Sequence, residues 1–100
     1  MHIAGQVGVA PDGTLAASPE GQIEQAWKNV IALIEAAGMT LQDVVKITTF
    51  LTGAQHLPAL RQVRDRMLGG AEPASTLLIV AGLAQPQWIV EIEAIAAKAG

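Results

Sequence analysis

The sequence predicts one α+β domain in which two helices cover one face of a single sheet. Two segments, residues 19–37 and 57–68, repeat apolar residues every three or four positions, which is the period of an amphipathic helix. Four short segments alternate in polarity or are rich in β-branched residues, as strands are. These are residues 2–9, 44–52, 75–83 and 89–97. The expected element order is therefore β-α-β-α-β-β.

Length and composition limit the class of protein. One hundred residues suit a single domain without a linker, and 51% hydrophobic against 15% charged residues exclude a disordered chain. No apolar run reaches the roughly 18 residues of a membrane helix, so we expect a cytoplasmic protein with no membrane partner. A net charge of −3, two tryptophans and one phenylalanine argue against nucleic acid as a partner. Without cysteine there is no thiolate nucleophile and no zinc–thiolate site.

The first strand contains glycines where strands normally carry side chains. Gly5 and Gly8 interrupt residues 2–9. Glycine inside a strand indicates a bulge or the close approach of a ligand or another chain.

Capping signals bound the two helices. Ser18 is expected to cap the first helix and Gly38 to end it, while Gly69 ends the second. The stripe of the first helix that faces the core should be Ile23, Trp27, Val30, Ile34 and Ala37. That of the second should be Leu57, Leu60, Val63 and Met67.

Alternation within the strands predicts which side chains face the core. In residues 44–52, one face should hold Val45, Ile47, Thr49 and Leu51, and the other Lys46, Thr48 and Phe50. In residues 89–97, Val90, Ile92, Ala94 and Ala96 should oppose Ile89, Glu91, Glu93 and Ile95. Residues 75–83 are apolar on both faces, which predicts a strand in the middle of the sheet or under an oligomer contact. Because two helices cannot cover both faces of the sheet, we expect a cyclic oligomer.

Glu91 and Glu93 are the first candidates for catalysis. Two positions apart on one strand, they share a face with α-carbons about 7 Å apart. Carboxylates this close disfavour each other's ionisation, a property used in acid–base catalysis. The spacing alone favours a solvated strand face, and a glycosidase-like pair is geometrically possible without further support.

Other polar residues carry weaker signals. His2 and His56 belong to no ligand-spaced cluster, so surface histidines are expected rather than a metal site. Ser75 lacks the G-x-S-x-G elbow of a serine hydrolase, which favours an ordinary strand serine. Arg61 can bind a carboxylate, or it can pair with Asp65 four residues on.

Four motifs follow one another along nearly the whole chain. They are Ala4-Gly5-Gln6, residues 43–52, Pro73-Ala-Ser-Thr76 and Val90-Glu-Ile-Glu-Ala-Ile95. Together they resemble the Rid family, also called the YjgF family, chiefly through the closing Glu-Ile-Glu-Ala-Ile-Ala. The resemblance implies a chorismate-mutase-like fold with a mixed sheet and two helices on one face. It also implies a homotrimer with a central barrel and ligand clefts between subunits.

The resemblance further implies an activity and its residues. Characterised members hydrolyse reactive enamines and imines, made by pyridoxal-phosphate enzymes, to 2-oxo acids and ammonia without a metal or cofactor of their own. Glu91 matches the glutamate that positions the attacking water, and Ala4 and Gly5 match cleft residues. Glu93 is left as structural support, paired across the subunit boundary.

The sequence departs from the family at the substrate anchor. The family's Pro-Ala-Arg-Ser becomes Pro-Ala-Ser-Thr, so Ser75 replaces the arginine that fixes the substrate carboxylate. A serine hydroxyl donates one neutral hydrogen bond and cannot form a bidentate charged pair. Loss of the arginine anchor is expected to weaken substrate binding by about 2 kcal/mol or more. Arg61, where deaminases often carry asparagine, is our hypothesis for part of the missing charge.

Two further departures concern the cleft. Ala4 stands where many members have serine, and the chain begins at a strand that the family usually reaches later, so its opening segment with a cleft tyrosine is expected to be missing. The sequence therefore favours a homotrimer that binds a small carboxylate-bearing metabolite without the arginine-dependent activity, Glu91 facing Ser75. The alternative is a 2-iminobutanoate/2-iminopropanoate deaminase.

Overall fold

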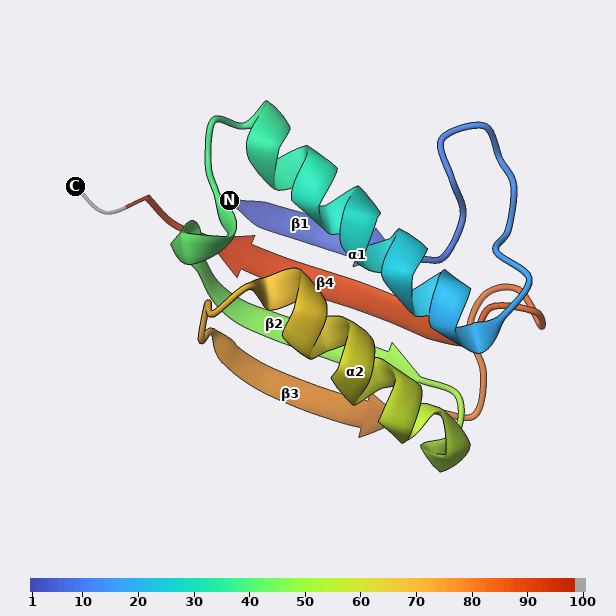
Figure 1. The fold of residues 1–100 in the computed structure, drawn as a ribbon. Helices are drawn as coiled ribbons and strands as arrows, with labels where there is room; N and C mark the ends of the chain where they lie inside the picture. Colours follow the sequence, from blue (N-terminus) through green and yellow to red (C-terminus); the bar gives the residue numbers. More distant parts are fainter. Residues whose placement is uncertain (99–100) are drawn as a thin grey trace.

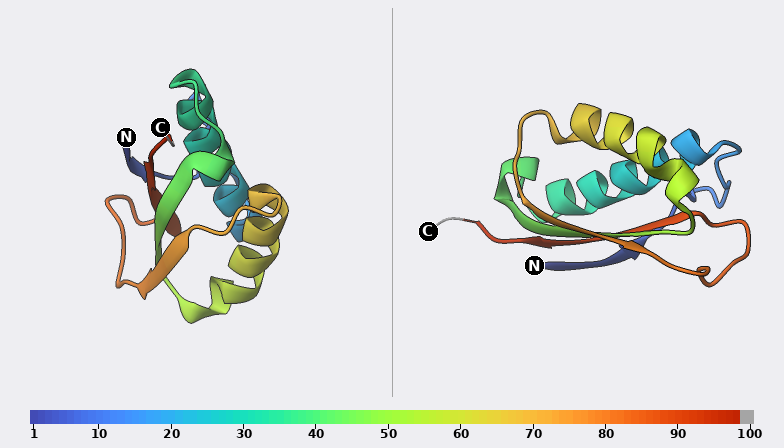
Figure 2. Two further views of the ribbon diagram at one scale, coloured as in Figure 1. Left: turned by 90° about the vertical axis from the view of Figure 1, so that its left-hand side faces the viewer. Right: turned by 90° about the horizontal axis from the view of Figure 1, so that it is seen from below.

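The protein folds into a four-stranded sheet with two helices on one of its faces (Figures 1 and 2). The computed structural model describes residues 1–98. The strands are β1 (His2–Gln6), β2 (Val44–Leu51), β3 (Ala74–Ile79) and β4 (Val90–Ala96). The helices are α1 (Pro19–Ala36) and α2 (Leu57–Leu68), with 3-10 turns at Leu41–Asp43 and Ala54–His56. Both the predicted class and the element order are confirmed.

The sheet is mixed and has the order β1-β4-β2-β3. Strand β4 lies antiparallel between β1 and β2, whereas β3 runs parallel to β2 at the edge. The helices lie on one side, and the other side of the sheet is bare in the right-hand view of Figure 2. Neither helix in the described part of the chain is long and apolar enough to cross a membrane.

Strand β3 corrects the prediction of a central strand at residues 75–83. It ends at Ile79, pairs only with β2 and leaves every one of its residues exposed. Leu77, Leu78 and Ile79 are 40%, 45% and 51% exposed. An apolar run favours a covered strand, but it does not identify which other surface covers it. The other expectation, cover by an oligomer contact, stays a prediction.

The core fills the space between the helices and the sheet. Trp27 and Ile34 of α1 and Ile92 of β4 have no exposed surface. The alternation predicted for the last strand is confirmed, because Val90, Ile92, Ala94 and Ala96 are all buried. One predicted core residue is wrong: Ala37 is exposed, since it forms the C-cap of α1 just beyond the last turn.

A bulge in β2 explains a second error. Val45 was expected to face the core with Ile47, yet it is 49% exposed and Val44 is buried instead. The pairing between β2 and β4 shifts register between Val44 and Lys46. One extra residue in a strand reverses the faces on one side of it. Beyond the bulge, the predicted alternation holds.

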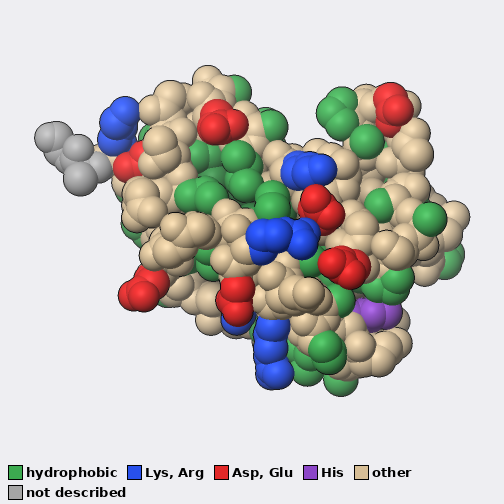
Figure 3. Space-filling model, viewed as in Figure 1, with side chains coloured by type: hydrophobic (Ala, Val, Ile, Leu, Met, Phe, Trp, Pro, Cys, Tyr) green, Lys and Arg blue, Asp and Glu red, His purple; other side chains and the backbone are tan. Residues whose placement is uncertain are grey.

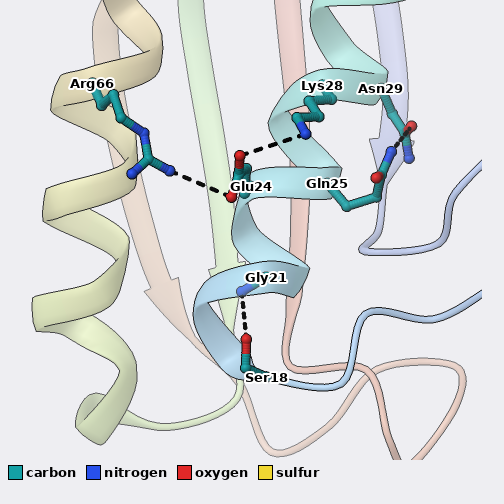
Figure 4. A network of polar contacts seen from close by, with 7 residues as sticks. All are labelled: Ser18, Gly21, Glu24, Gln25, Lys28, Asn29 and Arg66. Atoms are coloured by element: carbon teal, nitrogen blue, oxygen red, sulfur yellow. Dashed lines mark hydrogen bonds and ion pairs between the residues drawn. The ribbon is translucent and has the colours of Figure 1, made fainter.

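Polar contacts fix the ends and the packing of the helices (Figure 4). Ser18 caps α1 as predicted, its Oγ accepting a 2.9 Å hydrogen bond from the Gly21 amide. Glu24 of α1 lies 3.5 Å from both Lys28 and Arg66, so it links α1 to α2. Exposed pairs of this kind contribute about 1 kcal/mol or less. The helical face in Figure 3 shows charges of both signs interspersed with apolar side chains.

A buried glutamine ties the chain ahead of β4 to α1. Gln22, only 5% exposed, donates from Nε2 to the Gln87 carbonyl at 3.0 Å and accepts from the Ile89 amide at 3.1 Å. Gly8 packs directly against it, because a Cβ on Gly8 would lie 2.6 Å from Gln22 Cα. The close approach that Gly8 indicated is therefore made by the backbone of α1.

Candidate functional site

The bare face of the sheet brings Gly5 and Glu91 into contact. Glu91 is half-buried on β4, opposite Phe50 of β2. The pairing of β1 with β4 is irregular between Ile3 and Gln6, which confirms the bulge that Gly5 indicated. A Cβ on Gly5 would lie 2.5 Å from Glu91 Cδ and 2.7 Å from Oε1. The glycine therefore leaves the space that the carboxyl group occupies.

The Glu91 carboxylate keeps its hydrogen-bonding capacity. None of the side-chain hydrogen bonds or ion pairs within residues 1–98 involves it. Ala4 and Gly5 beside it are exposed. A carboxylate accepts hydrogen bonds only, so this group can hold a water molecule or a ligand N–H next to exposed backbone.

Glu93 has a different environment. It lies opposite Thr48, and its Oε2 is 3.5 Å from Nε2 of His2, whose side chain is 65% exposed. His2 is thus the surface histidine that was expected. The partner found for Glu93 belongs to the same chain rather than to another subunit. Across residues 1–98, no cluster of three His, Asp or Glu side chains could hold a metal ion.

Ser75 and Glu91 do not face each other within one chain. Ser75 pairs with Ile47, whereas Glu91 pairs with Phe50 three residues further along β2. With β2 between them, they are offset by about 10 Å along the strands and about 10 Å across them. Ser75 also shares the side of buried Ile47, and Glu91 the opposite side. Within one chain the two residues are therefore apart, and the expectation that Glu91 faces Ser75 across a cleft between subunits stays a prediction.

Arg61 is also separated from Glu91 within the chain. It is exposed on α2, on the helix side of the sheet, while Glu91 lies on the bare face. The alternative, an ion pair with Asp65, is not formed within residues 1–98, where the partner of Asp65 is Arg64 at 3.7 Å. Within one chain, neither Arg61 nor Ser75 lies beside Glu91.

These features define an α+β protein with a mixed sheet, two helices on one face and a glycine–glutamate site on the other. The family model described as endoribonuclease L-PSP matches residues 1–98. The chain belongs to this family, which is the Rid or YjgF family that the sequence predicted.

Known relatives confirm the fold. The structure of the YjgF gene product of E. coli matches with a TM-score of 0.92 and 30% identity over 98% of this chain and 80% of that chain. That of E. coli TdcF with bound serine gives 0.93 and 28% identity over the same shares. The 2-iminobutanoate/2-iminopropanoate deaminase of Mus musculus is 35% identical over 98% of this chain and 73% of its own length.

Proposed function

We propose that the chain forms a homotrimer that binds a small carboxylate-bearing metabolite beside Glu91, in clefts between copies, without arginine-dependent deamination. The contact between Gly5 and Glu91 carries the proposal, because it exposes an unpaired carboxylate next to accessible backbone. Ser75, which stands at the position of the deaminases' arginine, brings no charge to this site.

Exposed apolar side chains support assembly. Five large ones on the strands are 40–51% exposed: Val45, Leu77, Leu78, Ile79 and Ile95. Exposed apolar side chains in this number favour cover by another protein surface, and closed symmetric oligomers are the commonest solution. Light scattering during size-exclusion chromatography should give three times the chain mass of 10.4 kDa. A monomer would contradict the proposal.

The separation of Glu91 from Ser75 and Arg61 supports clefts between copies. A ligand carboxylate needs hydrogen-bond donors, and the Glu91 carboxylate supplies none. Donors from α2 or β3 can reach Glu91 only from a second chain, because the strand register separates them from Glu91 within the first. Backbone amides near Gly5 and the Ser75 hydroxyl are neutral donors that each give the ligand carboxylate a single hydrogen bond, without the bidentate geometry of an arginine.

An imine-hydrolysis assay tests the missing activity. Imines generated by a pyridoxal-phosphate enzyme should hydrolyse at the spontaneous rate in the presence of the wild-type chain. Ser75→Arg should gain ammonia release, since it restores a bidentate carboxylate anchor, whereas Ser75→Ala should not. Acceleration by the wild-type chain would reject the proposal.

The alternative is that the chain is itself an imine deaminase. The 35% identical mouse relative bearing that name favours it, as does the free carboxylate of Glu91. Glu91 would then orient the attacking water, and Glu91→Gln should lower ammonia release at least about tenfold. An unchanged rate would remove Glu91 from the mechanism.

A further inference from the structure

Amide side chains of α1 bind the backbone next to both halves of the Glu91 site. They are Gln22, Gln25 and Asn29, and intervals of three and four residues place them along one side of the helix. Gln25 donates to Asn29 Oδ1 at 2.9 Å, the pair that Figure 4 shows on α1. These amides lie on the helix side of the sheet, whereas Glu91 lies on the bare face.

Asn29 holds the chain that follows β1. Its Nδ2 donates to the Val7 carbonyl at 3.0 Å and to the Val9 carbonyl at 2.9 Å, so both hydrogens of the amide are used. Gly8, between these two carbonyls, is buried and packs against the backbone of α1. The end of β1 that carries Gly5 is therefore fixed to α1.

Gln22 holds the chain that leads into β4. Its amide donates to the Gln87 carbonyl and accepts from the Ile89 amide, as described above. The Ile89 carbonyl in turn accepts a 3.0 Å hydrogen bond from the Thr52 amide, just beyond β2. The N–H and the C=O of Ile89 are therefore both fixed, two residues before Glu91.

The ladder between β1 and β4 restrains the contact of Gly5 with Glu91 only weakly. It is irregular between Ile3 and Gln6, and beyond this irregularity the residues in register within the described chain are Gln6 and Ile92 alone. A bulge leaves one residue unpaired and disrupts the hydrogen bonds around it. Restraint from outside the sheet therefore matters most at this point.

We infer that Gln22 and Asn29 are positioning residues of the Glu91 site. They bond one helix to the ends of both strands, and so keep Gly5 in contact with the Glu91 carboxyl group. An amide suits position 22 because it donates and accepts at once, which neither a carboxylate nor an aliphatic side chain does. This role rests on the proposed function, because it serves binding only if a ligand lies beside Glu91.

Nuclear Overhauser effects (NOEs) measure the positioning without any ligand. A Cβ on Gly5 would lie 2.7 Å from Glu91 Cγ, so Gly5 Hα should show an NOE to Glu91 Hγ in the wild-type chain. Gln22→Met keeps a side chain of similar length but removes both hydrogen bonds, and this NOE should be lost. NOEs between Thr48 and Glu93, paired across β2 and β4, should persist as the control. A folded Gln22→Met chain that keeps the Gly5–Glu91 NOE would overturn the inference, as would its absence from wild type.

Asn29→Leu is the second variant and decides the matter if Gln22→Met does not fold. Asn29 is half-buried, so its replacement should destabilise the chain less than that of Gln22. The variant removes both hydrogen bonds to the chain after β1, and the same NOE from Gly5 to Glu91 should disappear. An Asn29→Leu chain with an unchanged NOE would reject the positioning role.

Binding of 2-oxobutanoate gives the functional readout. Gln22→Met should weaken it about tenfold. Combined with Gly5→Ala, it should add little further loss, since both changes displace the same carboxyl group. Val63→Ala truncates a buried residue of α2 and is the matched control: it should lower the melting temperature but leave binding unchanged.

Two outcomes of the binding experiment have separate meanings. Fully additive losses from Gln22→Met and Gly5→Ala would contradict positioning through the contact with Gly5. A wild-type chain that does not bind 2-oxobutanoate would count against the proposed function alone, because the NOE measurement decides the positioning role without a ligand.

Discussion

Gly5 and Glu91 share a space that only a residue without a side chain leaves open. A Cβ on Gly5 would lie 2.5 Å from Cδ and 2.7 Å from Cγ of Glu91. The bulge in β1 thus determines where the carboxyl group on β4 can lie. The backbone of β1 at Gly5 therefore affects the position of the candidate catalytic carboxyl group on β4.

Gly5→Ala should displace the Glu91 carboxyl group and weaken ligand binding beside it by about tenfold. Stability should change by less than about 1 kcal/mol, because the group that must move is the end of a half-buried, flexible side chain. Titration with 2-oxobutanoate and a thermal melt measure the two effects. Gly82→Ala is the control, since no atom lies within 4 Å of its added Cβ. Equal binding by both variants would mean that the contact does not position the ligand.

Leu78→Lys should prevent assembly. Leu78 is 45% exposed and shares the bare face with Phe50, its partner on β2. A buried, unpaired ammonium would cost several kcal/mol in an interface. Light scattering should therefore report a monomer. Leu33→Lys adds the same charge at a 40% exposed leucine on α1 and should leave the assembly intact. Loss of assembly in both variants would remove the sheet face as the explanation.

Mixed oligomers test whether the cleft joins two copies. Suppose that Ser75→Arg gains imine hydrolysis. A chain carrying both Ser75→Arg and Glu91→Gln should then be inactive alone, as wild type is. Co-refolded with wild type, it should regain activity, because its arginine meets the intact Glu91 of another copy. Mixtures that stay inactive, while Ser75→Arg alone is active, would place both residues in one chain's site.

Ile92→Ala and Ile95→Ala should change stability by different amounts, because the two residues lie on opposite faces of β4. Ile92 has no exposed surface, so its truncation should lower the free energy of unfolding by about 2–5 kcal/mol. Ile95 is 40% exposed, and its truncation should cost less than about 1 kcal/mol in dilute, unassembled protein. Urea unfolding measures both. Similar losses of unfolding free energy in the two variants would contradict the placement of Ile92 on the buried face and Ile95 on the exposed face.

Asp12 should titrate below the usual range of aspartate. The Thr14 amide donates to Asp12 Oδ1 at 2.9 Å, and this hydrogen bond lowers the pKa of the carboxyl group. A lowered folded-state pKa means that its stabilising contribution is present above the ordinary pKa and is lost as the pH falls through the lowered value. The Thr14 amide NMR signal should follow that titration. Asp12→Asn should abolish this pH dependence of the Thr14 signal. A titration midpoint at or above the ordinary pKa of aspartate would contradict the hydrogen bond.

Local signals predicted local structure well. Ser18 marked the start of α1, Gly69 follows α2 in a left-handed conformation with φ of 56°, and the alternation of β4 predicted its buried face. Each of these depends on neighbouring residues only. Gly5 belongs to the same group, because a glycine within a strand can be recognised in the sequence. Its contact with Glu91 cannot be recognised there.

Long-range pairing explains the errors. The β2 bulge exposed Val45, and the edge position exposed β3. Neither of these follows from local composition. Gln22 was missed for the same reason, since its two backbone partners lie 65 and 67 residues away. The only signal in the sequence for the role of Gln22 is that it is a glutamine on a helix face that otherwise carries apolar residues.

The position of β4 also has a consequence for synthesis on the ribosome. Of the four described strands, β4 is the last along the chain, yet it lies second in the sheet and joins β1 to β2. Until it emerges, β1 has no neighbour among these strands, and only β2 and β3 can pair. The Met1 ammonium bonds the Ala96 carbonyl across 95 residues, which is typical of slow, late-closing topologies. A stalled nascent chain would therefore expose the apolar side of α1, the kind of surface that chaperones bind.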